Sequence, residues 1–451
     1  MFADRRQRFL DALGPESVAI LIGARLANRS ADTEYPFRQD SDFWYLTGFD
    51  QPDAIAVLRT DGGPAFSLFV QPRDRAAETW TGIRPGIEGA VEHYGADEAH
   101  PCSEFVDKLP GVLERARHIY HVLGRREDID RKIISVQEEL RTRTKLGFAP
   151  AADLVDPRHL IHEMRLFKAA DEIALMRSAA AISAEAHQRA AEFAQPGNFE
   201  YQLEAELLHV FRGRGGSGPA YGSIVGGGHN AAILHYVTND QPLTKDSMVL
   251  IDAGAELAGY ASDVTRTYPV GGRFTGAGRA VYEVVLASQE AALAECRPGA
   301  TLPQIHEAAV RALIEGMVSL QLVDGTVDDI FKAESYKPWY MHGTSHWLGL
   351  DVHDVGSYTS PGAGSGSVPG SAASDPASTN NEPRKLEPGM VFTVEPGLYI
   401  REDDEDAPEA LRGIGVRIED DVVITDSGYE NLNSAIPKHI PDVEAWVRAA
   451  S

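Results

Sequence analysis

The stretch "VLIDAGAELAGYASDVTRTY" (residues 249–268) has the pattern of a β-hairpin that carries two aspartates. Apolar and β-branched residues flank both acids, and "ELAG" supplies the turn. With Leu257 and Ala258 at the turn centre, Asp252 and Asp263 become cross-strand partners whose Cβ atoms lie roughly 4.5–5.5 Å apart. If the pair is buried, it must share a proton, meet a cation or coordinate a metal. The alternative is a pair of exposed aspartates on an edge hairpin.

A second acid pair shifts the balance towards metal binding. Glu395 in "VFTVEPG" and Glu419 in "GVRIEDD" also stand in apolar, strand-like runs. The order is the same in both places, a strand with one acid followed by a strand with another. Such an echo fits an internally duplicated fold, although two matches of this kind also arise by chance. Four acids embedded in β-runs are the beginning of a ligand set.

Histidines complete this set in "YMHGTSHWLGLDVHDVG" (residues 340–356), which contains His342, His346 and His353. A structural role accounts for one buried histidine in such a stretch rather than three. Carboxylates combined with an imidazole suit Mn²⁺, Co²⁺, Zn²⁺ or Fe²⁺. The sequence therefore predicts a metal site built from acids and at least one histidine.

Composition limits the class of protein and its partners. A chain of 451 residues predicts two domains, and 43% hydrophobic with 24% charged residues is typical of a soluble globular protein. The net charge of −25 argues against nucleic acid as a partner, and no run resembles a membrane-spanning helix or a secretory signal. The two cysteines, Cys102 and Cys296, lack CxxC-like spacing, so we expect neither thiolate ligation nor a disulfide framework. We therefore expect a cytoplasmic protein.

The chain divides near Leu166 in this interpretation. Residues 1–165 alternate helical and strand-like runs and predict an α/β domain. Residues 166–451 begin with a long helix candidate and predict an α+β domain. Four runs of the first domain are interpreted as strands, at residues 17–25, 42–49, 54–60 and 65–74.

One segment of the second domain has a different composition. Residues 357–385 are rich in Ser, Gly, Pro and Ala and show no apolar periodicity. This composition predicts a flexible surface insertion. A loop of that length inside a compact domain is unusual.

Four motifs together resemble the pita-bread metallopeptidases, namely "IDAGAELAGYASDVTRT", "HGTSHWLGLDVHD", "LEPGMVFTVEPGLYI" and "GVRIEDDVVIT". In that family two Asp, one His and two Glu bind two metal ions, in that order. The stretch "EYPFRQDSDFWYLTGFDQPDA" (residues 34–54) is similar to the bacterial aminopeptidase P branch of the family. The resemblance covers nearly the whole chain apart from residues 357–385. It implies an α/β N-terminal domain followed by an α+β pita-bread catalytic domain.

The resemblance also implies the ligand assignment. Asp252 binds one metal ion, and His346 and Glu395 bind the other. Asp263 and Glu419 bridge both ions, for which Mn²⁺ is expected first, with Zn²⁺, Co²⁺ or Fe²⁺ as alternatives. Four carboxylates balance two divalent cations, and a metal-bridging hydroxide is then the nucleophile. Glu395 doubles as the general base and acid.

Three further histidines match positions that line the family's site. His342 and His353 are implied to bind substrate and to stabilise the tetrahedral intermediate. The alternative for each is a histidine that packs in the core. His235, in "ILHYVTND", matches a histidine beside the proline subsite.

Other side chains are expected to support the ligands or the substrate. Arg417 lies two residues before Glu419, so both point to one face of a strand, and Arg417 is expected to orient a metal-binding carboxylate. Tyr399 and Trp80 match substrate-pocket positions. For Trp80 the alternative is a half-buried packing aromatic.

The implied activity is release of the N-terminal residue from peptides with proline at position two. An Xaa-Pro bond is a tertiary amide without an N–H, which ordinary peptidases cannot hydrogen-bond. One alternative is a prolidase restricted to Xaa-Pro dipeptides. The motif at residues 34–54 favours the aminopeptidase activity, although Arg266 and Arg412 could still bind a dipeptide carboxylate. Another is a metal-free binding protein, which should have lost ligands, whereas none is lost. The partners expected are such peptides and a second or further copies of the chain, as a homodimer or homotetramer.

Overall fold

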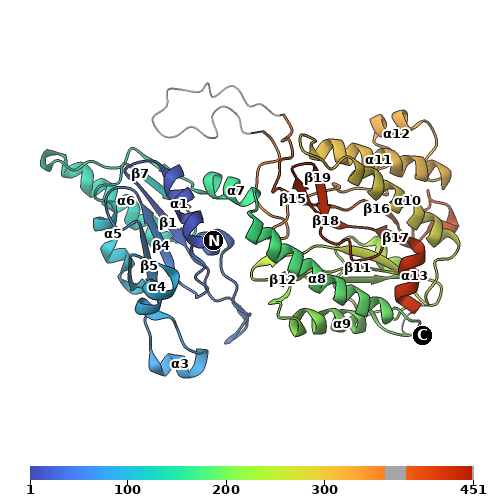
Figure 1. Cartoon of the computed structure of the whole chain (residues 1–451), viewed down its shortest axis with the longest axis horizontal. Coiled ribbons are helices and arrows are strands. Elements are labelled where there is room, and N and C mark those ends of the chain that lie inside the picture. The colour runs from blue at the N-terminus through green and yellow to red at the C-terminus, as the bar shows by residue number, and fades with distance from the viewer. Residues whose placement is uncertain (361–381, 449–451) are drawn as a thin grey trace. The chain divides into compact units, whose positions relative to one another are not determined.

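The computed structural model in Figure 1 describes residues 1–360 and 382–448. It divides into two compact units that meet in the sequence between Met164 and Arg165, called here the N-terminal unit and the C-terminal unit. Most of the predicted insertion, residues 361–381, lies outside the described residues. None of the helices in the described part combines the length and the apolar character needed to cross a lipid bilayer.

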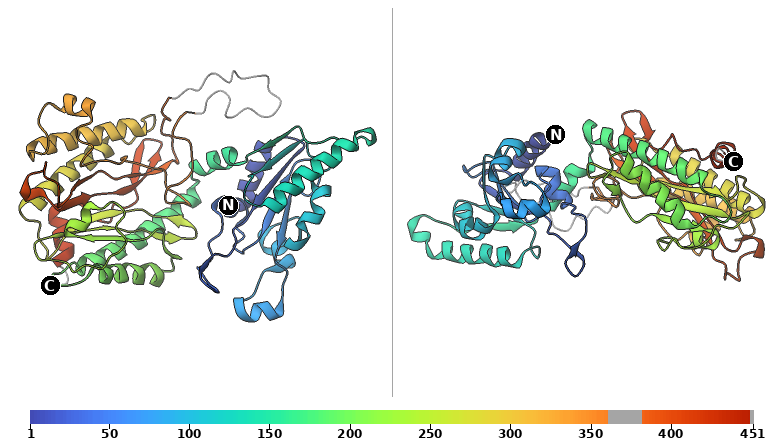
Figure 2. Two further views of the ribbon diagram at one scale, coloured as in Figure 1. Left: turned by 180° about the vertical axis from the view of Figure 1, so that it is seen from behind. Right: turned by 90° about the horizontal axis from the view of Figure 1, so that it is seen from below.

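A six-stranded mixed sheet forms the middle of the N-terminal unit, in the order β6-β5-β4-β1-β7-β8. Strand β1 pairs antiparallel with β4 and parallel with β7. Helices α5 and α6 cover one face and bury apolar side chains such as Leu109 and Ile133 against it (Figure 2). The strands are β1 (Ser17–Ile22), β4 (Ile55–Arg59), β5 (Phe66–Val70), β6 (Glu98–Pro101), β7 (His118–His121) and β8 (Asp153–Val155), and β2 (Asn28–Ser30) pairs separately with β3 (Thr33–Glu34).

One helix of this unit stands where the sequence predicts a strand. The prediction for residues 42–49 is wrong, because the segment forms α2 (Ser41–Thr47). The Asp40 carboxylate accepts a hydrogen bond from the backbone N–H of Phe43 at 3.0 Å and so caps the helix. Gly48 ends it in the left-handed conformation, with φ of 66°. The other helices up to the unit boundary are α1 (Phe2–Leu13), α3 (Arg75–Thr81), α4 (Gly86–Tyr94), α5 (Phe105–Leu113), α6 (Glu127–Thr142) and α7 (Arg158–Leu166), which crosses it.

Two pairs of long helices flank the strands of the C-terminal unit. Helices α8 and α9 pack together on one side, and α10 and α11 pack together on the other (Figures 1 and 2). Their apolar faces and part of the strands form the main core, while Val394 and Val422 pack with Leu293 and Ile305 in a second cluster. The helices are α8 (Ala170–Glu192), α9 (Glu200–Gly213), α10 (Gly276–Ala294), α11 (Leu302–Ser319), α12 (Val327–Ala333) and α13 (Ile440–Arg448).

The strands of this unit repeat one arrangement twice. In the first half β11 pairs with β14, and β12 pairs with β13. In the second half β15 pairs with β18, and β16 pairs with β17. Helix α8 packs on β12 and β13, while α10 packs on β16 and β17. The strands are β9 (Gly218–Pro219), β10 (Ile224–Gly227), β11 (Met248–Asp252), β12 (Ala255–Leu257), β13 (Tyr260–Ala261), β14 (Thr265–Pro269), β15 (Val391–Val394), β16 (Gly397–Ile400), β17 (Ile414–Arg417), β18 (Asp420–Thr425) and β19 (Gly428–Asn431).

The four predicted acidic ligands lie at the breaks within these two long hairpins. Asp252 ends β11, and Asp263 lies between β13 and β14. Glu395 lies between β15 and β16, and Glu419 lies between β17 and β18. The echo seen in the sequence is therefore a repeat of topology. A break in the ladder turns each acid away from the regular pleat, so that the four side chains can converge.

The predicted register of the first hairpin is wrong by two residues. Asp252 pairs with Thr265 rather than with Asp263. Ala258 and Gly259 have φ values of 49° and 83°, which the centre of a tight two-residue hairpin turn requires. The turn is therefore centred one residue later than predicted. Because the side-chain period of a strand is two residues, this shift leaves the two aspartates close to one another.

The two ends of the insertion lie next to each other. The backbone N–H of Ser360 donates to the carbonyl of Glu382 at 2.9 Å, and that of Arg384 donates to the carbonyl of Tyr358 at 3.0 Å. The flanking residues are thus part of the folded C-terminal unit, and only a short connection is needed to join them.

Deletion of Gly362 to Asn380 is expected to leave the melting temperature within a few degrees of the parent. It joins Pro361 to Asn381 as a two-residue turn between bonded ends, and shortening a loop lowers its closure entropy cost. Differential scanning calorimetry measures the change. A large drop in melting temperature would show that the deleted residues pack on the chain, and a selective loss of activity would give them a role at the site.

Candidate metal centre

Three side chains from different parts of the C-terminal unit place ligand atoms together. One donor atom each from Asp263, His346 and Glu419 lies within 4.8 Å of the other two. Asp263 and Glu419 are buried, and the His346 side chain is 16% exposed. Two buried carboxylates and an imidazole at this spacing match the donor set of a divalent transition-metal ion.

Glu395 extends this cluster at the same ring nitrogen of His346 that Asp263 approaches. His346 Nε2 lies 3.5 Å from Asp263 Oδ2 and 3.5 Å from Glu395 Oε1. His346 Nδ1 lies 3.0 Å from the carbonyl oxygen of Trp347, which can only accept, so this nitrogen carries the proton. Nε2 is therefore the nitrogen that faces the carboxylates, as a metal-binding histidine requires.

The carboxylates of the cluster favour the binding of cations. Burial is the main cause that raises the pKa of Glu395 to about 7, and burial with the charge of Asp263 raises that of Glu419 well above its usual range. Burial disfavours a charged His346, but Asp263 and Glu395 outweigh it and raise its pKa to about 9. Without metal, the site thus compensates its carboxylates with protons. Divalent ions can replace these protons, so the residues fit a metal centre.

Asp252 is held by two side chains at the edge of this cluster. Tyr221 hydroxyl oxygen lies 2.5 Å from Asp252 Oδ1 and 2.5 Å from Asp263 Oδ1, which links the two aspartates directly. Arg417 Nη2 donates to Asp252 Oδ2 at 2.6 Å. Asp252 therefore stands beside Asp263, as the hairpin argument expects, although not as its cross-strand partner. Tyr221 lies in a glycine-rich loop, and no pattern in the sequence points to it.

Arg417, at the end of β17 in the second half of the repeat, donates to the carboxylate of Asp252 in the first half. Besides Asp252, it donates from Nε to the Thr265 hydroxyl at 3.0 Å. Thr265 in turn donates to Glu419 Oε2 at 2.6 Å, and its carbonyl accepts from the Glu419 backbone N–H at 3.1 Å. Arg417 thus holds Asp252 directly and Glu419 through Thr265, a residue that the sequence analysis missed.

A second chain of hydrogen bonds runs from Arg417 to His342. Arg417 Nη1 donates to the Tyr399 hydroxyl at 3.0 Å, and this hydroxyl lies 2.8 Å from His342 Nε2. His342 Nδ1 lies 2.7 Å from the carbonyl of Gly343, so Nδ1 carries the proton and Nε2 accepts from Tyr399. Burial first and then the Arg417 charge lower the pKa of His342 to about 4. His342 is therefore a neutral ring with both nitrogens bonded, and Tyr399 is buried behind it.

His353 and His235 lie on the accessible side of the cluster. The ring of His353 stands edge-to-face to that of His346, with centroids 4.4 Å apart. Within the described residues no hydrogen bond occupies its ring nitrogens, so they can bind a ligand. His235 is exposed, and its charge contributes to the lowered pKa values of both His342 and His353, which places it near the same site.

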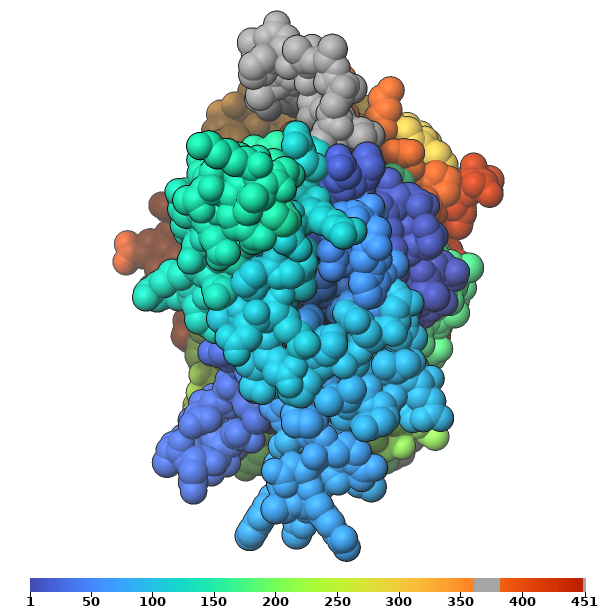
Figure 3. All heavy atoms as spheres, turned by 90° about the vertical axis from the view of Figure 1, so that its left-hand side faces the viewer, coloured from blue at the N-terminus to red at the C-terminus, as the bar shows by residue number. Residues whose placement is uncertain are grey.

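Trp80 belongs to the N-terminal unit, where it lies on α3. Its side chain is 87% exposed, so the alternative of a half-buried packing aromatic does not describe it. The α3 segment projects from the body of its unit (Figures 1 and 3). The role of Trp80 in the substrate pocket stays a prediction.

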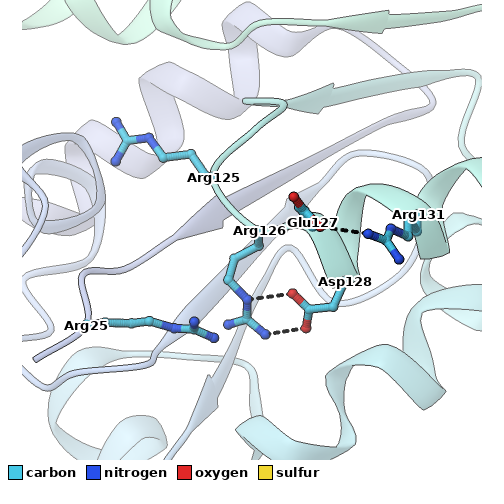
Figure 4. Close-up of a pocket in the computed structure, with 6 residues that line it drawn as sticks. All are labelled: Arg25, Arg125, Arg126, Glu127, Asp128 and Arg131. Carbon is cyan, nitrogen blue, oxygen red and sulfur yellow. Dashed lines mark hydrogen bonds and ion pairs between the residues drawn. The ribbon is translucent and has the colours of Figure 1, made fainter.

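A hollow on the N-terminal unit differs from this site in its chemistry (Figure 4). Each arginine there has its own acidic partner: Arg126 bonds to Asp128 and Arg131 to Glu127, at 2.5 and 2.7 Å. Asp53 and Asp40 likewise pair with the two others, Arg25 and Arg125. The positive charges are balanced locally, which leaves no strong attraction for an anion.

A buried histidine supports the main chain next to Asp252. His187 is fully buried, and its Nε2 lies 2.9 Å from the carbonyl of Ala253, to which it must donate. Its Nδ1 lies 3.1 Å from the Tyr268 hydroxyl. Burial is the first cause that lowers the pKa of His187 to about 4, from a usual value of 6.5.

This depressed pKa predicts loss of stability in acid. His187 binds a proton near pH 6.5 in the unfolded chain and only near pH 4 in the folded chain. Its contribution to the free energy of unfolding is therefore complete above pH 6.5 and falls by about 3 kcal/mol as the pH drops to 4. His187→Gln keeps a neutral donor and is expected to flatten this decline. Urea unfolding of both proteins with chelator at pH 7 and pH 4.5 measures it. Parallel declines would show that His187 does not titrate as described.

Comparison with known proteins places both units in described families. Residues 174–426 match the model of metallopeptidase family M24, and residues 2–120 match that of the aminopeptidase P N-terminal domain. The chain is 44% identical to an Xaa-Pro aminopeptidase of Escherichia coli K12 over 451 residues, which is 100% of this chain and 98% of the relative. It is 34% identical to human Xaa-Pro aminopeptidase 3 over 97% of this chain and 82% of the relative.

Solved structures agree with these matches. The structure of Pseudomonas aeruginosa aminopeptidase PepP superposes with a TM-score of 0.92 at 44% identity and covers 100% of this chain and 98% of its own. A zinc-substituted Escherichia coli aminopeptidase P in complex with product gives a TM-score of 0.91 at 43% identity, with the same coverage. The likeness therefore extends over both units and includes a relative that holds zinc.

Proposed function

This chain belongs to metallopeptidase family M24, with an aminopeptidase P type N-terminal domain before a pita-bread catalytic domain, and from this premise we propose that it removes the N-terminal residue from peptides with proline at position two. The observation that carries the proposal is that four acids from the breaks of the repeated hairpins lie together with His346. Full-length identity of 44% to an Xaa-Pro aminopeptidase supports the activity.

Two divalent ions, Mn²⁺ first, are proposed as the cofactor. Asp252 would hold one ion and His346 with Glu395 the other, and Asp263 and Glu419 would contribute to holding both. When bound, such ions polarise a carbonyl and lower the pKa of a coordinated water. Titration of chelator-treated protein with Mn²⁺ and with Zn²⁺ by calorimetry is expected to give two ions per chain, and one ion per chain would contradict the bridging roles.

Glu395 is proposed to carry the proton of the reaction. Its carboxylate lies 3.5 Å from His346 Nε2 and its side chain is 16% exposed, so it faces the place where the attacking water would be held. Glu395 accepts a proton from the attacking water and delivers it to the nitrogen of the departing proline. Thr393, whose hydroxyl donates to Glu395 Oε1 at 3.2 Å, orients the carboxylate.

The two neighbouring histidines are proposed to have different tasks. Both nitrogens of His342 are already bonded, to Tyr399 and to the Gly343 carbonyl, so this ring shapes the wall of the site. His353 keeps its ring nitrogens available and can donate to the oxygen that becomes negative in the transition state. His235 is assigned to the rim where the proline ring lies.

Dipeptide specificity would need a cation for the dipeptide carboxylate. Arg266 is buried and donates to Asp420, to the Glu419 carbonyl and to other backbone oxygens. Arg412 donates to the carbonyls of Ala407 and Glu405. The sequence leaves both arginines as candidates to bind a dipeptide carboxylate, but neither is placed for that role.

The length of the preferred substrate tests this point. With Mn²⁺ present, Ala-Pro-Ala is expected to be hydrolysed faster than Ala-Pro, because neither Arg266 nor Arg412 is placed to bind a carboxylate directly after proline. Initial rates at equal concentration of the two peptides measure it. A strong preference for Ala-Pro would make the protein a prolidase.

We also propose that the chain forms a homodimer or homotetramer in the cytoplasm. Trp80 and Ile83, which are 87% and 80% exposed, leave apolar surface on the α3 segment that a second copy can cover. Cys102 and Cys296 form no disulfide, which suits a reducing compartment. Light scattering of the parent and of Trp80→Ser tests the assembly, and a monomeric parent would contradict it.

A further inference from the structure

A buried polar cluster lies behind the wall of the site and has no part in the metal set. The Thr344 hydroxyl, in a residue that is 1% exposed, lies 2.7 Å from His306 Nδ1 and 2.7 Å from the Tyr340 hydroxyl. His306 comes from α11, which approaches from outside the strands. The rings of His306 and Tyr340 also face each other, with centroids 5.9 Å apart.

The protons in this cluster have one consistent arrangement. Burial, and then the charge of Lys337, lower the pKa of His306, so its ring is neutral at pH 7. Thr344 can then donate to Nδ1 of His306 while it accepts from Tyr340. Each hydroxyl donates once in this chain, and a fully satisfied buried network is rigid.

Thr344 also holds the main chain beside the reacting groups. Its carbonyl accepts from the backbone N–H of Glu395 at 2.9 Å. On the other side, the Tyr340 ring stands edge-to-face to His342, with centroids 4.9 Å apart and an interplanar angle of 74°. One residue is thus fixed by His306 through its side chain and fixes Glu395 through its backbone.

We propose that His306 is a positioning residue for the reaction, acting through Thr344 on Glu395 and through Tyr340 on His342. The inference rests on the proposed function, since it assigns these two groups to the site. His306 itself does not touch substrate or metal. A small displacement of Glu395 or His342 lowers the rate, because catalysis depends on the alignment of groups to within a fraction of an ångström.

Matched pairs of substitutions separate positioning from packing. Thr344→Val keeps the shape and removes the hydroxyl, whereas Thr344→Ser keeps the hydroxyl. His306→Leu removes the acceptor, whereas His306→Asn places its amide oxygen at the position of Nδ1. With Ala-Pro-Ala and saturating Mn²⁺, kcat is expected to fall about tenfold in the Val and Leu variants. KM and metal content are expected to stay at the parental level, and the Ser and Asn variants to stay within about threefold of the parental kcat.

Coupling between the two residues gives a further check. Because His306 acts through Thr344, the double variant with Leu and Val is expected to lose no more activity than either single variant. Additive losses would show two separate effects and overturn the proposal. A parental kcat in Thr344→Val would also overturn the proposal. This outcome can be tested even if His306→Leu folds poorly.

Hydrogen exchange provides a measurement without substrate. In the full-length protein, the backbone amide of Glu395 is expected to exchange faster in Thr344→Val and His306→Leu than in the parent and in the Ser and Asn variants, because its acceptor loses its anchor. Unchanged exchange of this amide would overturn the proposal. An inactive parent that still shows the exchange pattern would instead count against the proposed function alone.

Discussion

Asp263→Asn is expected to lower activity by at least about 10³-fold and to reduce metal binding at both positions. The residue lies 3.5 Å from His346 Nε2, belongs to the tightest group of ligand atoms and shares Tyr221 with Asp252. The asparagine keeps the shape but removes a charge that is proposed to hold both ions, and a loss of several kcal/mol of metal-derived stabilisation corresponds to that factor.

The same substitution is not expected to lower the melting temperature of the metal-free protein. Burial first, and then the charge of Asp263, raises the pKa values of Asp252 and Glu419, as expected for buried carboxylates that repel one another. Removal of one charge relieves this repulsion, so the melting temperature with chelator should not fall. The rise in melting temperature that Mn²⁺ gives to the parent should largely disappear.

Elemental analysis and thermal melts with and without Mn²⁺ measure both effects. Asp240→Asn, an exposed aspartate of the same unit, is the control for the loss of one charge and should match the parent. A protein with Asp263→Asn that keeps two ions and full activity would contradict the assignment.

His353→Ala is expected to lower kcat by roughly 10²-fold while metal content and melting temperature stay unchanged. Its ring lies against that of His346 and offers a donor to the reacting oxygen, and loss of one such donor typically costs this much. Kinetics on Ala-Pro-Ala with a parallel thermal melt measure it. His439→Ala, which removes an exposed histidine of the same unit, is the matched control.

A different outcome would change the role of this residue. If His353→Ala lowers the melting temperature and leaves kcat at the parental value, His353 is a packing histidine, which was the alternative in the sequence. If the metal content falls instead, His353 is a ligand rather than a donor to substrate.

The acids of the proposed site are apparent in the sequence because each lies in a local pattern. Asp252, Asp263, Glu395 and Glu419 interrupt apolar runs, and a charged residue in a buried strand needs a partner wherever the strand lies. The repeat of that pattern corresponds to two hairpins broken at equivalent points. Four carboxylates close together, three of them buried, then need protons or cations to balance their charge.

Predictions that depend on exact backbone angles are less accurate. The register of the first hairpin follows from positive φ values at Ala258 and Gly259, and an Ala-Gly pair is a weaker signal for such a turn than Asn-Gly. The α2 helix was predicted as a strand because aromatic residues favour strands, whereas the Asp40 cap decides the structure.

Contacts between distant segments could not be predicted from local patterns at all. Tyr221 is 31 residues from Asp252, and His306 is 38 residues from Thr344. Neither carries a periodic or motif-like signal, since a tyrosine in a loop and a histidine on a helix are ordinary. Only the fold shows that one links two ligands and that the other supports the wall of the site.

Analysis of the products formed from two tripeptides tests the central claim most directly. Ala-Pro-Ala and Ala-Ala-Ala are each incubated with Mn²⁺-loaded protein and with chelator-treated protein, and the products are identified by mass spectrometry. We expect free Ala and Pro-Ala from the first peptide, negligible cleavage of the second, and no cleavage after chelation. Comparable rates on Ala-Ala-Ala, or release of Ala-Pro from Ala-Pro-Ala, would contradict it.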